Sequence, residues 1–255
     1  MIRAALLLLA LVLTPVTAAA QELSLSVAVS MKEAVEELAR GFGAGRPGVV
    51  LRFNFGASGE LQKQIEAGAP VDLFVSAAQR QMDELEKAGL IVTSSRRAFA
   101  RNVLTIIKPA DSRFDISRPG DLLDPKVKRI VIGNPKTVPV GQYSEESLRA
   151  LGLWERIQPK LILAENVRQA LDYVVRGEVD AGFVYTTDAA MRAGRVTEAF
   201  RPSEDTYRPI VYPAAVMAAS RQQALARSFI EFLVSREAQT VLARLGFQPA
   251  PPGAR

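Results

Sequence analysis

The sequence predicts an α/β protein whose sheets are mainly parallel and flanked by helices. Strand patterns alternate with helical patterns along nearly the whole chain, which is typical of parallel sheets with crossover helices. Hydrophobic residues make up 48% of the chain, enough for a full core. Two long extended segments, near residues 101–108 and 208–218, bracket the middle of the chain. If both cross between folded halves, the protein has two lobes, although one large domain also fits the length.

The first part of the chain carries three strand–helix pairs. Residues 23–29 alternate apolar and polar side chains, as in a half-buried strand, and apolar residues then recur at helical spacing. The third helix stops at Gly89, since glycine commonly follows the last helical turn. The predicted elements are strands 23–29, 49–55 and 72–75 and helices 31–42, 61–67 and 79–88.

The alternation continues to the end of the chain. Pro109 ends the next strand, because proline has no N–H to give to a sheet. A long apolar strand and two helices come last. The predicted elements are strands 103–107, 129–132, 161–163, 181–185 and 210–218 and helices 144–151, 167–176, 222–234 and 236–245.

The first twenty residues have the pattern of a secretory signal peptide. A charged start with Arg3 precedes an apolar run over 4–13, and Ala18 and Ala20 form a small-residue cleavage site. The run is too short to span a membrane, which needs roughly 20 apolar residues. We expect cleavage after Ala20 and a periplasmic, soluble protein. No Cys follows the run, so we do not expect a lipoprotein.

The composition excludes several function classes. The chain has no Cys and therefore no disulfide, and its lack of His removes the commonest general base and metal ligand. The net charge is +5, but the arginines are scattered over predicted helix faces and form no basic run. We therefore expect no nucleic-acid partner, no cofactor and no bound metal cation, and a monomer that is not an enzyme.

Two serines stand where a predicted strand runs into a helix. Ser30 follows the first strand and Ser58 follows the second. The first N–H groups of a helix lack internal partners and lie at its positive end, so such turns can bind an oxyanion. Each turn also has a purely structural interpretation. Ser30 and Glu33 match a capping box, and the glycines beside Ser58 occur in any tight turn.

Three further positions follow the same reasoning. Pro139 fixes a helix start that leaves the Val140 N–H free, and Asn166 is a good N-cap that leaves the Val167 N–H at the positive helix end. Tyr185 ends a strand and could offer its hydroxyl. Any one of these features is commonly structural, so the residues alone leave both interpretations open.

Taken together, these motifs resemble the periplasmic molybdate-binding proteins, which are the soluble receptors of bacterial ABC importers. The resemblance covers nearly the whole mature chain. Its most specific stretch is residues 56–77, and the supporting stretches are residues 134–141, 151–154, 164–171 and 182–189.

The resemblance implies a type II periplasmic-binding-protein fold with an oxyanion held between two lobes. It implies lobes of residues 21–102 plus 214–255 and of residues 103–213, hinged by two crossover segments. It assigns anion binding to five residues: Ser30, Ser58, Val140, Val167 and Tyr185. The sequence departs from relatives in two places, because Ser58 stands without neighbouring hydroxyl residues and Val140 replaces a frequent Ala.

The expected function is capture of molybdate, and of tungstate, for an ABC transporter permease. Molybdate and tungstate are tetrahedral dianions of nearly equal size. Another tetrahedral oxyanion, sulfate or phosphate, is the alternative, since only cleft size separates these ligands. An exported serine hydrolase is a remote third possibility, because a Ser–His pair is impossible here and neither serine belongs to a Ser-x-x-Lys motif.

Overall fold

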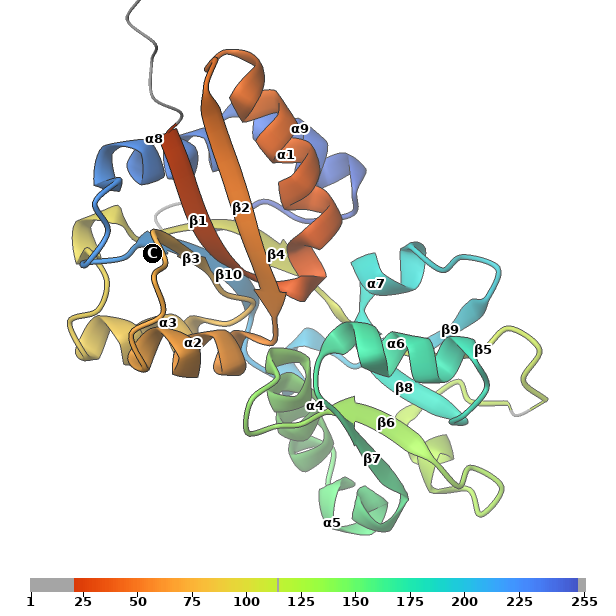
Figure 1. The fold of residues 1–255 in the computed structure, drawn as a ribbon. Coiled ribbons are helices and arrows are strands. Elements are labelled where there is room, and N and C mark those ends of the chain that lie inside the picture. Colours follow the sequence, from red (N-terminus) through yellow and green to blue (C-terminus); the bar gives the residue numbers. More distant parts are fainter. Residues whose placement is uncertain (1–20, 114, 252–255) are drawn as a thin grey trace, which may run out of the picture.

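The protein forms two lobes, each built on one five-stranded sheet (Figure 1). The computed structural model describes residues 21–113 and 115–251. The expected signal peptide, residues 1–20, lies outside the described residues. Within the described part, no helix has the length and apolar content needed to cross a membrane. The α/β prediction with two helix-flanked sheets is confirmed.

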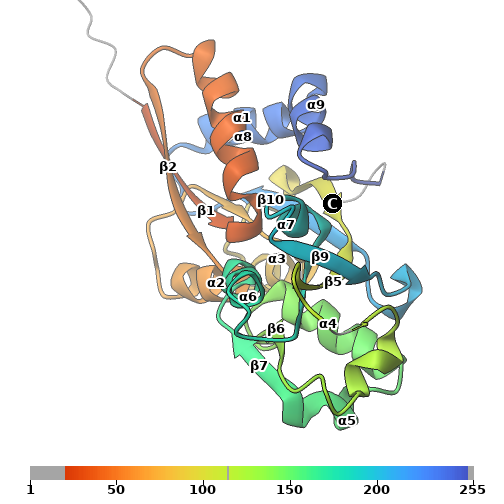
Figure 2. The ribbon, with the colours of Figure 1, turned by 90° about the vertical axis from the view of Figure 1, so that its right-hand side faces the viewer.

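The first lobe contains the strand order β2-β1-β3-β10-β4. Helices cover both faces of this sheet, with α2 and α3 on one side and α1, α8 and α9 on the other (Figures 1 and 2). Its strands are β1 (Gln21–Ala28), β2 (Val49–Gly56), β3 (Leu73–Val75), β4 (Arg97–Asn102) and β10 (Ile210–Val216), and its helices are α1 (Lys32–Ala44), α2 (Ser58–Glu66), α3 (Gln79–Lys87), α8 (Gln223–Leu233) and α9 (Arg236–Arg244).

The second lobe contains the strand order β7-β6-β8-β5-β9. Figure 1 shows α6 and α4 beside this sheet, next to the first lobe. Its strands are β5 (Leu104–Pro109), β6 (Ile130–Gly133), β7 (Leu161–Ala164), β8 (Ala181–Tyr185) and β9 (Val196–Phe200), and its helices are α4 (Pro139–Ala150), α5 (Trp154–Ile157), α6 (Val167–Val175) and α7 (Thr186–Ala190).

Both sheets are mixed, which corrects the expectation of mainly parallel sheets. In each sheet two strand pairs are parallel and two are antiparallel. The antiparallel pairs involve β10 and β5, the strands that carry the chain into a lobe from the other one. Leu104, at the start of β5, pairs with Tyr185, at the end of β8. A strand that enters at the hinge must run away from it, whereas the parallel strands run toward it.

Two crossovers connect the lobes, and polar contacts tie them together. One passes through Val103 between β4 and β5, and the other covers residues 201–209 between β9 and β10. The Leu104 N–H donates to the Tyr207 hydroxyl at 3.3 Å, which joins the two segments. Asn102 donates to the hydroxyls of Thr187 and Tyr212, at 2.9 and 3.2 Å. The second crossover ends earlier than expected, because β10 begins at Ile210.

Candidate anion-binding site

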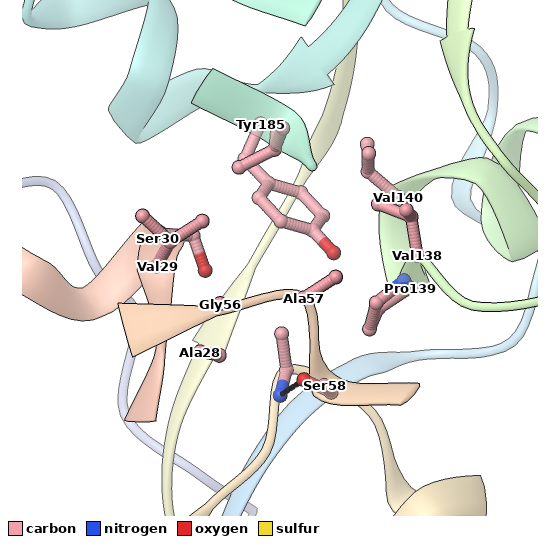
Figure 3. A pocket seen from close by; sticks show the side chains of 12 residues that line it. Ala28, Val29, Ser30, Gly56, Ala57, Ser58, Val138, Pro139, Val140 and Tyr185 are labelled. Carbon is pink, nitrogen blue, oxygen red and sulfur yellow. Dashed lines mark hydrogen bonds between the residues drawn. The ribbon is translucent and has the colours of Figure 1, made fainter. Parts of the chain in front are cut away.

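The five residues expected at the site all follow the carboxyl ends of strands. Ser30 follows β1, Ser58 follows β2, Val140 follows β6, Val167 follows β7, and Tyr185 is the last residue of β8. Carboxyl ends of parallel strands meet at one sheet edge, which is where open α/β sheets bind ligands. Here the edges of both lobes face each other, and all five residues line one small cavity between them (Figure 3).

The Ser30 hydroxyl is oriented by the neighbouring Tyr212. The Asn102 amide nitrogen, which can only donate, gives a hydrogen bond to the Tyr212 oxygen at 3.2 Å. The Tyr212 and Ser30 oxygens lie 3.1 Å apart, and either hydroxyl can be the donor. The bond from Asn102 polarises the Tyr212 hydroxyl and so favours donation by Tyr212, which leaves the Ser30 hydrogen for an acceptor in the cavity. The expected capping box is absent, because the N-cap of α1 is Met31 and no side chain caps it.

The Ser58 hydroxyl is oriented in the same sense by the backbone. The Ala77 N–H, just after β3, donates to the Ser58 oxygen at 3.0 Å (Figure 3). Because that N–H can only donate, it occupies a lone pair of the hydroxyl and leaves the Ser58 hydrogen free. Ser58 itself is fully buried at the first position of α2. Both serines are thus arranged as donors toward the cavity.

Helix N-termini supply further donors. Ser58 and Val167 are the first residues of α2 and α6, and Val140 is the second residue of α4. The first N–H groups of a helix have no intrahelical acceptor, and the helix dipole makes this end positive. At α6 the Asn166 side chain caps the N–H groups of Arg168 and Gln169, both at 3.0 Å, as expected for an N-cap. The Val167 N–H, at the first residue of α6, precedes these two capped groups.

The Tyr185 hydroxyl is buried and has no hydrogen-bond partner among the described residues. A buried hydroxyl without a partner costs free energy, so such a group at a cavity wall is suited to donate a hydrogen bond to a ligand. Burial, with smaller contributions from Tyr212, Tyr143 and Asp188, raises the pKa of this phenol well above 10. Tyr185 therefore stays protonated, and its hydroxyl can donate a hydrogen bond to an anion.

The cavity is a neutral site. Of the described residues that line it, none carries a charged side chain. The Nζ of Lys32, the first residue of α1, lies 5.8 Å from the centre of the Phe55 ring, and Lys32 does not line the cavity. The donors are hydroxyls and N–H groups fixed by the fold, which can stabilise an anion without reorganising. No general base is placed beside either serine within this lining.

The structure adds residues that the sequence did not single out. The Gly59 N–H donates to the Thr137 carbonyl at 2.9 Å, a backbone bond between the lobes. A Cβ at Gly59 would lie 2.5 Å from that carbonyl oxygen, so only glycine permits this approach. Tyr212 and Arg168 were also missed, because their partners are far away in sequence. The one signal in the sequence for Gly59 is its residue type, because glycine often occurs where the backbone approaches another group closely.

The chain is similar to known proteins over most of its length. A model of the bacterial extracellular solute-binding proteins matches residues 23–248. This chain belongs to that family. A putative ABC transporter substrate-binding lipoprotein of Bacillus subtilis is 35% identical to this solute-binding protein, over 88% of this chain and 85% of that one.

Relatives of this solute-binding protein include proteins named for molybdate. The molybdate-binding protein ModA of Haemophilus influenzae is 35% identical, over 90% of this chain and 91% of that one. The solved structure of the Azotobacter vinelandii periplasmic molybdate-binding protein superposes with a TM-score of 0.80 at 26% identity, covering 90% of this chain and all of that one. The two-lobe fold is therefore that of periplasmic binding proteins.

Proposed function

We propose that this protein captures molybdate between its lobes and delivers it to an ABC transporter permease. The observation that carries the proposal is the convergence of five neutral donor positions, from both lobes, on one cavity. At this cavity the Tyr185 hydroxyl has no partner within residues 21–113 and 115–251. Hydrogen bonds to a charged group contribute roughly 1.5–3 kcal/mol each, so several of them can offset the desolvation of a dianion. The relatives named for molybdate support the choice of anion.

The proposed donors are the hydroxyls of Ser30, Ser58 and Tyr185 and the N–H groups of Val140 and Val167. Val140 can replace the alanine of relatives, because its contribution is a backbone N–H. We propose no catalytic activity, since the serines are arranged as hydrogen-bond donors. Tungstate is proposed as a second ligand because of its matching size and charge.

The remaining expectations stay proposals of the same kind. We propose a periplasmic monomer, released from its signal peptide after Ala20 and not lipid-anchored. We propose that it uses no cofactor and binds no nucleic acid. The lobes are proposed to comprise residues 21–102 with 214–255, and residues 103–213, except that residues 210–213 belong to β10 in the first lobe's sheet.

Calorimetric titration of the purified protein with molybdate, tungstate and sulfate tests the ligand. We expect one molybdate per chain, similar binding of tungstate, and no displacement by sulfate in hundredfold excess. Sulfate is smaller, so donors held by two rigid lobes cannot all reach its oxygens. Tight sulfate binding with weak molybdate binding would instead assign the protein to sulfate.

The double substitution Ser30→Ala and Ser58→Ala tests the donor assignment. Each change removes one charge-assisted hydrogen bond, so we expect molybdate affinity to fall by at least a hundredfold, from roughly 1.5–3 kcal/mol per bond. Circular dichroism should show an unchanged fold. Unchanged affinity in the folded double variant would refute the assignment of these two serines.

A further inference from the structure

The side chain of Arg168 reaches from the second lobe to the first. It belongs to α6, directly after the proposed donor Val167, and its Nη2 lies 2.6 Å from a carboxylate oxygen of Glu33 in α1. The same nitrogen donates to the Ser30 carbonyl at 3.3 Å. Only 17% of the Arg168 side chain is exposed, whereas 45% of the Glu33 side chain is exposed. The Arg168 guanidinium thus joins the two lobes in two ways, through an ion pair with Glu33 and through a hydrogen bond to the Ser30 carbonyl.

A second carboxylate holds the other side of this guanidinium. The Arg168 Nε lies 3.3 Å from Asp188, which is fully buried in α7 of the second lobe. Asp188 in turn accepts a hydrogen bond from the Tyr185 N–H at 3.3 Å. We call Arg168 with its partners Glu33, Asp188 and the Ser30 carbonyl the Arg168 bridge.

The Arg168 bridge touches three of the five proposed donor positions. It contacts the backbone of Ser30, it adjoins Val167 in sequence, and it reaches Tyr185 through Asp188. A planar guanidinium can bind several acceptors at fixed angles, which a Lys ammonium cannot do equally well. One side chain outside the cavity lining therefore connects donors from both lobes.

We propose that the Arg168 bridge is the ionic latch of the closed protein and positions Ser30 opposite Val167 and Tyr185. This inference rests on the proposed anion-binding function of the cavity. Contacts made only in the closed arrangement shift the balance between open and closed forms toward closure. They also slow the release of an anion, because opening must first break them.

Glu33→Gln is the variant that tests this proposal. It removes the inter-lobe charge pair but leaves Arg168 paired with the buried Asp188, so the second lobe keeps its buried ion pair. Glu37→Gln is the matched control. It lies one turn further along α1, and its partner Arg244 is in α9 of the same lobe.

Single-molecule energy transfer measures the closed fraction without any anion. The chain has no cysteine of its own, so Arg40→Cys and Arg156→Cys, exposed positions in different lobes, can carry the two dyes. We expect the closed-to-open ratio to fall at least threefold in Glu33→Gln and to stay unchanged in Glu37→Gln. A part-exposed ion pair contributes up to about 1 kcal/mol, which corresponds to about fivefold.

Stopped-flow release of molybdate provides the second measurement. We expect Glu33→Gln to speed release at least threefold and to change the association rate by less than twofold. Equal closed-to-open ratios in wild type and Glu33→Gln would overturn the latch, whatever the protein binds. If Glu33→Gln lowers the closed-to-open ratio but the wild-type protein does not bind molybdate, the proposed ligand is wrong and the latch still holds.

Discussion

A hydroxyl binds an anion through its hydrogen, so the groups that occupy its lone pairs decide whether it can act. Tyr212 donates to Ser30 and the Ala77 N–H donates to Ser58. The Ala77 N–H can only donate, which fixes the direction of its bond to Ser58. The Asn102 amide instead favours donation by Tyr212 to Ser30. Both serines can thus donate their hydrogen toward the cavity. Ser30 is oriented by the side chains of Asn102 and Tyr212, and Ser58 is oriented by the backbone N–H of Ala77.

The sequence predicted contacts between residues close in the chain, but not contacts between residues far apart in the chain. Asn166 caps α6 as its residue type predicts, because the capped N–H groups are two and three residues away. Ser30 matched a capping box with Glu33, yet its hydroxyl bonds to Tyr212, 182 residues along the chain. Glu33 pairs with Arg168 instead. Sequence spacing could not indicate either partner. Tyr212 comes from β10 of the same sheet as β1, and Arg168 comes from the other lobe.

Removing the hydroxyl of Tyr212 should weaken anion binding without touching the cavity lining. In Tyr212→Phe the Ser30 oxygen loses its donor, so its hydrogen is no longer directed into the cavity. We expect molybdate affinity to fall about tenfold, equivalent to about 1.4 kcal/mol for one oriented hydrogen bond, as measured by calorimetry. Tyr173→Phe, in α6 outside the cavity lining, should bind like the wild type. Equal affinities of both variants would contradict this role of Tyr212.

At the scale of elements, the central strands and the amphipathic helices were predicted well, but two of the four edge strands were not. The strands β4 and β9, both at a sheet edge, were missed. Polar and charged residues interrupt their apolar pattern, as edge strands tolerate. Helix α4 begins at Pro139, five residues before the predicted start at residue 144. Proline suits a first helical turn, and Gly141 is needed because a Cβ there would lie 1.9 Å from the Gly133 carbonyl oxygen.

The first turn of α2 offers a test of closure by steric means. In Gly59→Ala the new Cβ would meet the Thr137 carbonyl oxygen at 2.5 Å, so the lobes cannot close fully. We expect molybdate affinity to fall more than tenfold while the free energy of unfolding without anion is unchanged or slightly higher, because Ala favours helix. Calorimetry and urea denaturation measure the two quantities.

Gly43→Ala is the matched control for this prediction. Gly43 lies in α1, and a Cβ there would meet nothing within 4 Å. It should gain up to about 1 kcal/mol of stability and keep the affinity of the wild type. Normal affinity in Gly59→Ala would show that the contact with Thr137 is not required for binding.

At the scale of the whole molecule, the hinge explains both the strand directions and the place of the site. The parallel strands run toward the hinge and lead into helix starts, whereas β5 and β10 begin at the hinge and run away from it. The sequence pattern could predict strands but not their direction, because direction depends on which lobe the chain has just left. The crossovers at Val103 and at residues 201–209 overlap the extended segments expected near residues 101–108 and 208–218.

The buried Asp188 should make stability depend on pH. Burial raises the pKa of its carboxyl from 3.8 to about 6, more than Arg168 and the Tyr185 N–H lower it, and Glu33 raises it further. Between these two pH values the folded protein binds more protons at this site than the unfolded chain does. The contribution of Asp188 to the free energy of unfolding therefore falls as pH rises through this window, by at most about 1.4 kcal/mol per pH unit.

Urea denaturation of wild type and Asp188→Asn from pH 4 to 8 isolates this contribution. The stability of wild type minus that of the variant should decrease from pH 4 to about 6 and then level off. Subtracting the variant removes the titration of the other carboxylates that the two proteins share. A difference that increases with pH would mean that Arg168 outweighs burial and holds the carboxyl charged.

The backbone contact between Gly59 and Thr137 also limits how closely the lobes can approach. The nitrogen and oxygen lie 2.9 Å apart, an ordinary distance for this bond, and packed peptide groups resist further compression. A smaller anion therefore gains nothing from extra closure, because the donors of opposite lobes stop at the same separation whatever lies between them. The width of the cavity is thus preset by a backbone contact between two residues that do not line it, and this contact selects the size of the anion.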